Sequence, residues 1–189
     1  NTTAGSNVAV GYAALSANTT GTNNTSIGTG SLELNTTTSG NTAVGTNALE
    51  ANVAANNTAV GLNALVANTT GTENVAVGKS AGAAVTTGSY NTALGASALD
   101  VSTTGASNVA VGNNALGANT TASNNTAIGT DALLLNTTGS ANVAVGQGAL
   151  DSNTTASNNT AVGKSALAAN TTGANNNAFG KDTMADNTT

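Results

Sequence analysis

The sequence predicts an all-β fold: a parallel β-solenoid, or β-roll, of eleven rungs of about 17 residues, with two short strands in each rung. One observation behind this prediction is an internal repeat that fills all 189 residues. Another is the composition, with 23 Gly, 39% hydrophobic, 6% charged and 2% aromatic residues, which differs from that of an ordinary globular domain. In addition, turn residues separate two short apolar segments in every repeat.

The repeat is defined by the motif Asn-x-Ala-aliphatic-Gly, and its glycine is taken here as position 0. Successive glycines are separated by nine spacings of 17 residues and one of 16. They are Gly11, Gly28, Gly45, Gly61, Gly78, Gly95, Gly112, Gly129, Gly146, Gly163 and Gly180. The short spacing removes one residue from the turn region at 52–56, where a solenoid tolerates a deletion.

Two columns of apolar residues are the candidate core. Position −1 is always apolar and position +4 is Leu in nine repeats. The predicted core residues are Val10, Leu15, Val44, Leu49, Val60, Leu65, Val77, Val111, Leu116, Val145, Leu150, Val162 and Leu167. One Val and one Leu cannot offset the backbone entropy of a whole rung, so we expect stability to come from stacking of neighbouring rungs.

Asn at position −4 and Gly at position 0 are the candidate ladder and turn residues. The predicted residues are Asn7, Gly11, Asn41, Gly45, Asn74, Gly78, Asn108, Gly112, Asn142, Gly146, Asn159 and Gly163. Stacked identical strands permit side-chain amide ladders, both at position −4 and at position +7, where Asn-Thr-Thr recurs. The glycines are expected at corners with an unusual φ.

The period excludes helical solenoids, because 17 residues are too few for the helix pair of the known helical repeats. Parallel pairing of rungs about 4.8 Å apart would give a rod of roughly 50 Å. Small residues recur at positions −2 and +3. They indicate close packing, either by a neighbouring chain or across a thin, flattened coil.

Composition argues against several classes of function. The chain has no His or Cys and only three Lys, so neither a nucleic-acid partner nor a metal site is expected. No apolar stretch is long enough to span a membrane. Lys79–Ser80 and Lys164–Ser165 are adjacent pairs whose side chains would face opposite ways, and Glu33 above Glu50 would be a solvated pair. We therefore expect no enzyme activity, no catalytic residue and no cofactor.

Both chain ends lie in the same phase of the repeat, with Asn1-Thr2-Thr3 at one end and Asn187-Thr188-Thr189 at the other. No capping segment is visible. We expect residues 1–189 to form a single repeat array that is a segment of a longer fibre, or a unit that stacks end to end.

The units at 41–49 (Asn-Thr-Ala-Val-Gly-Thr-Asn-Ala-Leu) and 159–167 (Asn-Thr-Ala-Val-Gly-Lys-Ser-Ala-Leu) resemble repeats of bacterial trimeric adhesin heads and phage-type tail-fibre shafts. The resemblance covers the whole chain, although the period here is longer than that of the adhesin-head repeat. It implies a left-handed parallel β-roll of three chains that attaches to surfaces. The expected setting is therefore extracellular, at a cell surface or in a virion fibre, with a homo-oligomer and a host or cell-surface receptor as partners.

Two other functions stay open from the sequence. Regular Thr rows suggest an ice-binding β-solenoid, although adjacent Thr residues in a strand would face opposite ways. A self-assembling filament that stacks end to end is the other alternative. The Asn-Thr-Thr triplets also match the N-glycosylation pattern, which makes a ladder of glycans a further hypothesis.

Overall fold

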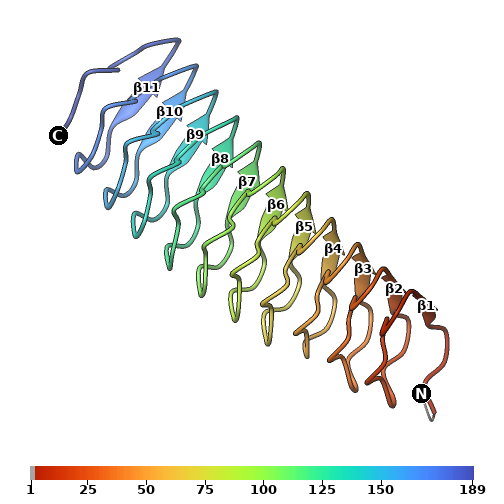
Figure 1. The fold of residues 1–189 in the computed structure, drawn as a ribbon. Coiled ribbons are helices and arrows are strands. Elements are labelled where there is room, and N and C mark those ends of the chain that lie inside the picture. Colours follow the sequence, from red (N-terminus) through yellow and green to blue (C-terminus); the bar gives the residue numbers. More distant parts are fainter. Residues whose placement is uncertain (1–2) are drawn as a thin grey trace.

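Each repeat contributes one strand, and the strands stack into a rod (Figure 1). The computed structural model describes residues 3–189. Its strands are β1 (Val8–Val10), β2 (Thr25–Ile27), β3 (Thr42–Val44), β4 (Thr58–Val60), β5 (Val75–Val77), β6 (Thr92–Leu94), β7 (Val109–Val111), β8 (Thr126–Ile128), β9 (Val143–Val145), β10 (Thr160–Val162) and β11 (Asn177–Phe179). They form one parallel sheet in sequence order, and its two outer strands lie at opposite ends of the rod. The predicted fold class, an all-β parallel solenoid, is confirmed.

The second apolar segment of each rung is a run of turns and not the second strand that we expected. In the rung of Gly112, Asn114 and Leu116 have φ angles of 54° and 51°, which lie in the left-handed region. A strand cannot accommodate such residues. The segment still bonds to its neighbour, since the Leu116 N–H donates to the Ala132 carbonyl at 3.0 Å. Each left-handed leucine costs roughly 1–2 kcal/mol of backbone strain, which its burial offsets.

The core consists of one leucine column and two alanine columns. The leucines of the predicted core are buried, from 8% exposed at Leu15 to 0% at Leu116; they are Leu15, Leu49, Leu65, Leu116, Leu150 and Leu167. The alanines at positions −2 and +3, such as Ala144 and Ala149, are also fully buried. The small residues therefore pack inside one thin coil, and no second chain is needed to cover them.

The valines predicted for the core do not lie in it. Val10 and Val77 are exposed, at 57% and 39%, and the remaining valines are partly exposed. This correction applies to Val10, Val44, Val60, Val77, Val111, Val145 and Val162. Successive strand residues face opposite sides, so an inward alanine at position −2 forces positions −3 and −1 outward. The thin interior has room for the alanine methyl group and not for a valine.

The asparagines at position −4 are mostly buried and connect successive rungs mainly through bonds to the backbone. In one pair the Asn108 Nδ2 also donates to the Asn91 Oδ1, at 3.2 Å. The Asn142 Oδ1 accepts a bond from the Asn159 backbone N–H at 2.9 Å, and its Nδ2 donates to the Ala156 carbonyl at 2.8 Å. The same two bonds recur along the rod. Among the predicted residues Asn41, Asn74, Asn108, Asn142 and Asn159 are buried, and Asn7 in the first rung is partly exposed.

The asparagines at position +7 form the true amide ladder. Asn153 donates from Nδ2 to the Oδ1 of Asn136 at 2.9 Å, and Asn170 donates in the same way to Asn153 at 3.0 Å. Each Nδ2 also donates to the carbonyl at position +10 of its own rung, as Asn153 does to Ala156 at 3.0 Å. Much of the interior is therefore polar, and most of its buried amide groups are hydrogen-bonded.

The glycines at position 0 are corner residues. Gly11, Gly45, Gly78, Gly112, Gly146 and Gly163 have φ angles between 127° and 137°. A Cβ atom placed on Gly112 would lie 2.6 Å from the carbonyl oxygen of Gly129 in the next rung. Both the backbone angle and the close contact between rungs therefore require glycine.

Candidate interaction surface

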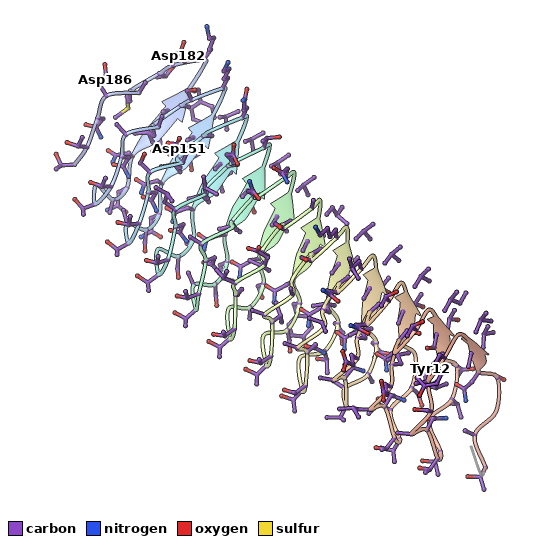
Figure 2. The ribbon with its side chains drawn as sticks, in the orientation of Figure 1. Tyr12, Asp151, Asp182 and Asp186 are labelled. Carbon is purple, nitrogen blue, oxygen red and sulfur yellow. The ribbon has the colours of Figure 1, made fainter. Side chains whose placement is uncertain are left out.

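The outer face of the sheet is the candidate interaction surface, and two columns of side chains form it. Column −3 carries Thr or Val in ten repeats and Asn in the last, and column −1 carries Val, Ile, Leu or Phe. Figure 2 shows side chains projecting from the strand side along the length of the rod. This outer strand face, as we call it, is where the valines displaced from the predicted core are found.

The apolar part of the outer strand face is continuous. Ile27, Val77, Leu94 and Ile128 in column −1 are between 36% and 40% exposed, and Phe179 in the last strand is 68% exposed. The strands stack in register, so each side chain contacts its copy in the next rung. The result is an uninterrupted stripe along a rod of roughly 50 Å, whereas monomeric proteins rarely expose large contiguous apolar patches.

The stripe carries no charge. All three lysines lie at position +1, beyond the corner glycine, and the chain has a formal charge of −5 spread over other columns. Figure 2 places Tyr12 near the N-terminal end and Asp182 and Asp186 at the opposite end. Contacts on the outer strand face would therefore be driven by burial of apolar area and would depend little on salt.

Among residues 3–189 the titratable residues gather neither into a cluster of metal-ligand type nor around a pocket. No group of three or more acidic residues could hold a metal ion, and no pocket is found there. Burial raises the pKa of the Asp100 carboxyl above its usual value, while a hydrogen bond with Ser97 opposes the shift. In the described part of the chain no hydrogen bond joins Lys79 to Ser80 or Lys164 to Ser165.

The two threonines of each Asn-Thr-Thr triplet have different environments. The hydroxyl of Thr137 donates to the carbonyl of Thr154 in the next rung at 3.0 Å, and Thr120 does the same to Thr137 at 3.1 Å. The second threonine, such as Thr138, is exposed. The hydroxyls of the first column therefore bond between rungs, although some of these threonines, such as Thr103, are themselves exposed.

The sequence contained a signal for the outer strand face that the core prediction passed over. Position −2 is almost uniformly Ala, whereas position −3 alternates between Thr and Val. A column that accepts Thr and Val equally is typical of a half-exposed sheet face. Positions −3 and −1 share one side of a strand, so the Thr content of column −3 indicates that column −1 faces outward too.

The chain was compared with protein-family models, with curated proteins and with solved structures, and none matched. Within residues 3–189, no helix has the length and apolar character that crossing a membrane requires.

Proposed function

We propose that this chain is a structural segment of an extracellular or virion surface fibre, where it serves as a stiff spacer and as an adhesive surface, with no enzymatic role. The observation that carries the proposal is the continuity of bonding along the rod. Strand pairing, the −4 asparagines and the leucine column each run through successive rungs. The resemblance to adhesin-head and tail-fibre repeats supports the same role.

Stacked rungs are suited to a spacer because the number of repeats sets the length of the rod. Deletion of one complete rung, residues 142–158, would join equivalent positions and should shorten the rod by about 4.8 Å. Small-angle X-ray scattering of both chains measures this difference in maximum dimension. A flexible scattering profile in either chain would contradict the stiff-spacer role.

The proposed partner is a further copy of the chain, bound through the outer strand face in a trimer or through the rod ends in a filament, with a host or cell-surface receptor as the eventual target. An uncharged stripe with one residue per rung fits a partner of identical period. Light scattering after size exclusion tests this on the wild-type chain and on Val77→Thr/Val111→Thr/Val145→Thr, which keeps β-branched residues on the face. We expect the wild type at a multiple of 17.8 kDa and the variant at one chain. A single-chain mass for the wild type would exclude lateral assembly, and long polydisperse species would indicate end-to-end stacking.

Ice binding is a second candidate, and the outer strand face favours it more than the Asn-Thr-Thr triplets do. Thr25, Thr42 and Thr58 stand on successive strands of column −3, one rung apart. They face outward beside the apolar column and form a regular row on a parallel sheet. Thermal hysteresis at micromolar protein tests this candidate, since equal melting and freezing points would exclude it.

A further inference from the structure

The fold separates the chain's Asn-x-Thr triplets into two groups. Seven triplets begin at position +7, where the asparagine is buried; they begin at Asn18, Asn35, Asn68, Asn119, Asn136, Asn153 and Asn170. Four begin at position −5, where the asparagine is exposed; they begin at Asn23, Asn56, Asn124 and Asn158. Three further matches to the acceptor pattern are Asn1, which lies outside the described residues, Asn24, which is buried and has Ser26 in place of the threonine, and Asn187, which is partly exposed in the last rung.

We propose that the four exposed asparagines, Asn23, Asn56, Asn124 and Asn158, are N-glycan acceptor sites of the folded rod, and that the buried asparagines at position +7 are not. This goes beyond the structural role proposed above. The step transfers a sugar from a lipid-linked sugar diphosphate. The side-chain Nδ2 loses one proton and forms the bond to C1 of the sugar, while the C1–oxygen bond to the diphosphate breaks and the diphosphate leaves with the electron pair.

The buried group cannot carry a glycan without losing the ladder. Both N–H bonds of the Asn153 Nδ2 are used, one to Asn136 Oδ1 at 2.9 Å and one to the Ala156 carbonyl at 3.0 Å. Asn153 is 0% exposed. A sugar on Nδ2 replaces one of these two N–H groups, so at least one buried acceptor would lose its donor, at about 1–3 kcal/mol, and the fully buried site has no space for the sugar ring.

The exposed group has the opposite geometry. Asn158 lies in a left-handed turn with a φ of 61° that directs its side chain away from the core, and its backbone N–H already bonds the Ser140 carbonyl at 3.1 Å. The next residue, Asn159, points into the core. Asn158 is therefore exposed and the hydroxyl residue Thr160 is partly exposed on the same outer side, with the buried Asn159 between them.

The arrangement of the four sites leaves room for glycans. Asn23 and Asn56 are two rungs apart, and Gly40 holds the same position in the rung between them. Asn124 and Asn158 repeat this pattern with Ala141 between them. Each pair is separated by about 10 Å along the rod, with a residue that has little or no side chain between its members.

The test is secretion of the chain from a eukaryotic cell, followed by mass spectrometry of the folded, protease-resistant fraction. Enzymatic release of the glycans converts each occupied Asn to Asp and so maps the sites. We expect occupancy at Asn23, Asn56, Asn124 and Asn158 and none at Asn119, Asn136 or Asn153. An intact mass of 17.8 kDa, or glycans on buried asparagines in this fraction, would overturn the proposal.

The matched control removes the hydroxyl residue of each exposed triplet with Thr25→Val, Thr58→Val, Thr126→Val and Thr160→Val. Valine already fills this strand position in Val8, Val75, Val109 and Val143, so the rod should fold unchanged. We expect this variant to return to the bare mass. A synthetic peptide of residues 147–162 cannot stack into rungs, so a transferase should modify both Asn153 and Asn158 in it. Modification of Asn158 alone would show that local sequence, and not burial, makes the selection.

Discussion

Two rungs of the rod fill the interior at positions +4 and +7 with different side chains. The rung of residues 142–158 has Leu150 at position +4 and Asn153 at position +7, and both are 0% exposed. The rung of residues 74–90 has Gly82 and Val85 at these positions, and Val85 is also 0% exposed. A Cβ atom on Gly82 would lie 3.5 Å from Cγ2 of Val85 and 3.0 Å from Cδ2 of Leu65. Apolar volume has therefore moved from position +4 to position +7 with little loss.

Val85 in place of an asparagine interrupts the amide ladder at position +7, which is one of the two asparagine columns. Asn68, in the rung before, is fully buried and its Oδ1 has no partner, because Val85 offers no amide where the next asparagine would stand. The −4 system is uninterrupted, since the Asn91 N–H donates to Asn74 Oδ1 at 2.9 Å. Apolar filling is therefore interchangeable between columns +4 and +7, whereas the −4 asparagines keep their bonds to the next rung from Asn7 to Asn159.

The largest expected effect is in the −4 asparagines, because they are equivalent in both rungs. Asn142→Asp would place a carboxylate oxygen against the Ala156 carbonyl, which now receives an N–H bond at 2.8 Å. We expect a loss of about 3–5 kcal/mol in the free energy of unfolding at neutral pH. Asn74→Asp should cost the same, because Asn74 bonds the Gly88 carbonyl at the same distance. Denaturant titration measures both, with the exposed Asn158→Asp as control, and a small loss at Asn74 would show that its rung is loosely held.

A smaller effect is expected when the residues of the irregular rung (74–90), Gly at position +4 and Val at position +7, are introduced into the regular rung (142–158). Leu150→Gly should destabilise by about 2–5 kcal/mol through loss of a buried side chain. Asn153→Val alone should cost about 1–3 kcal/mol, because it leaves the Oδ1 of Asn136 without its donor. In the double variant the valine should fill part of the leucine space, which gives a favourable coupling of about 1 kcal/mol in a double-mutant cycle. Strict additivity would mean that Val85 does not compensate for Gly82.

The reverse change should repair the irregular rung. Gly82→Leu with Val85→Asn restores the leucine column and gives Asn68 Oδ1 an amide donor. The added leucine adopts the left-handed angle that Gly82 has at 58°, so part of the gain is lost to backbone strain. We expect a net gain of about 1 kcal/mol. A loss of stability, seen as a lower urea midpoint, would indicate that the surrounding rungs have adapted to the exchange.

The smallest effect concerns pH and lies in the rung after the irregular one. Burial raises the pKa of Asp100 in the folded chain, so its ionisation favours the unfolded state. The stability contributed by the protonated carboxyl is complete below the unfolded pKa and is lost as pH rises through the folded pKa. Asp100→Asn should remove this step from a plot of unfolding midpoint against pH. An unchanged step would assign it to another acidic group.

The period, the solenoid class and the leucine column could be predicted from sequence because each depends on spacing and residue type alone. The outward direction of Val77 and Val111 could not be predicted from apolar character, since the thickness of the core decides which face of a strand is inside. The left-handed turns at Leu116 and Leu150 could not be predicted from the sequence for another reason. Leucine has no local preference for that angle, and only the bonds to adjacent rungs impose it.

The interaction surface could be predicted from the sequence only in part. The Thr content of column −3 indicated a half-exposed face, but the continuity of the apolar column beside it depends on how the rungs stack and could not be predicted. The division of the Asn-x-Thr triplets into buried and exposed groups could not be predicted from the sequence. Asn153 and Asn158 both begin an Asn-x-Thr triplet and differ in burial. Burial here is a property of the stacked coil and not of the triplet.

Hydrogen exchange of the wild-type chain, followed by mass spectrometry, tests most directly the claim that stacking between neighbouring rungs holds the rod together. The account predicts slow exchange of the backbone N–H groups at the −4 asparagines through the interior of the rod. It also predicts a local minimum of protection around residues 82–105, where Val85 interrupts the +7 ladder and Ser102 accepts only a long bond from the Asn119 Nδ2, at 3.4 Å. Rapid exchange throughout would contradict the solenoid, and uniform protection across residues 82–105 would contradict the role given to the amide ladder.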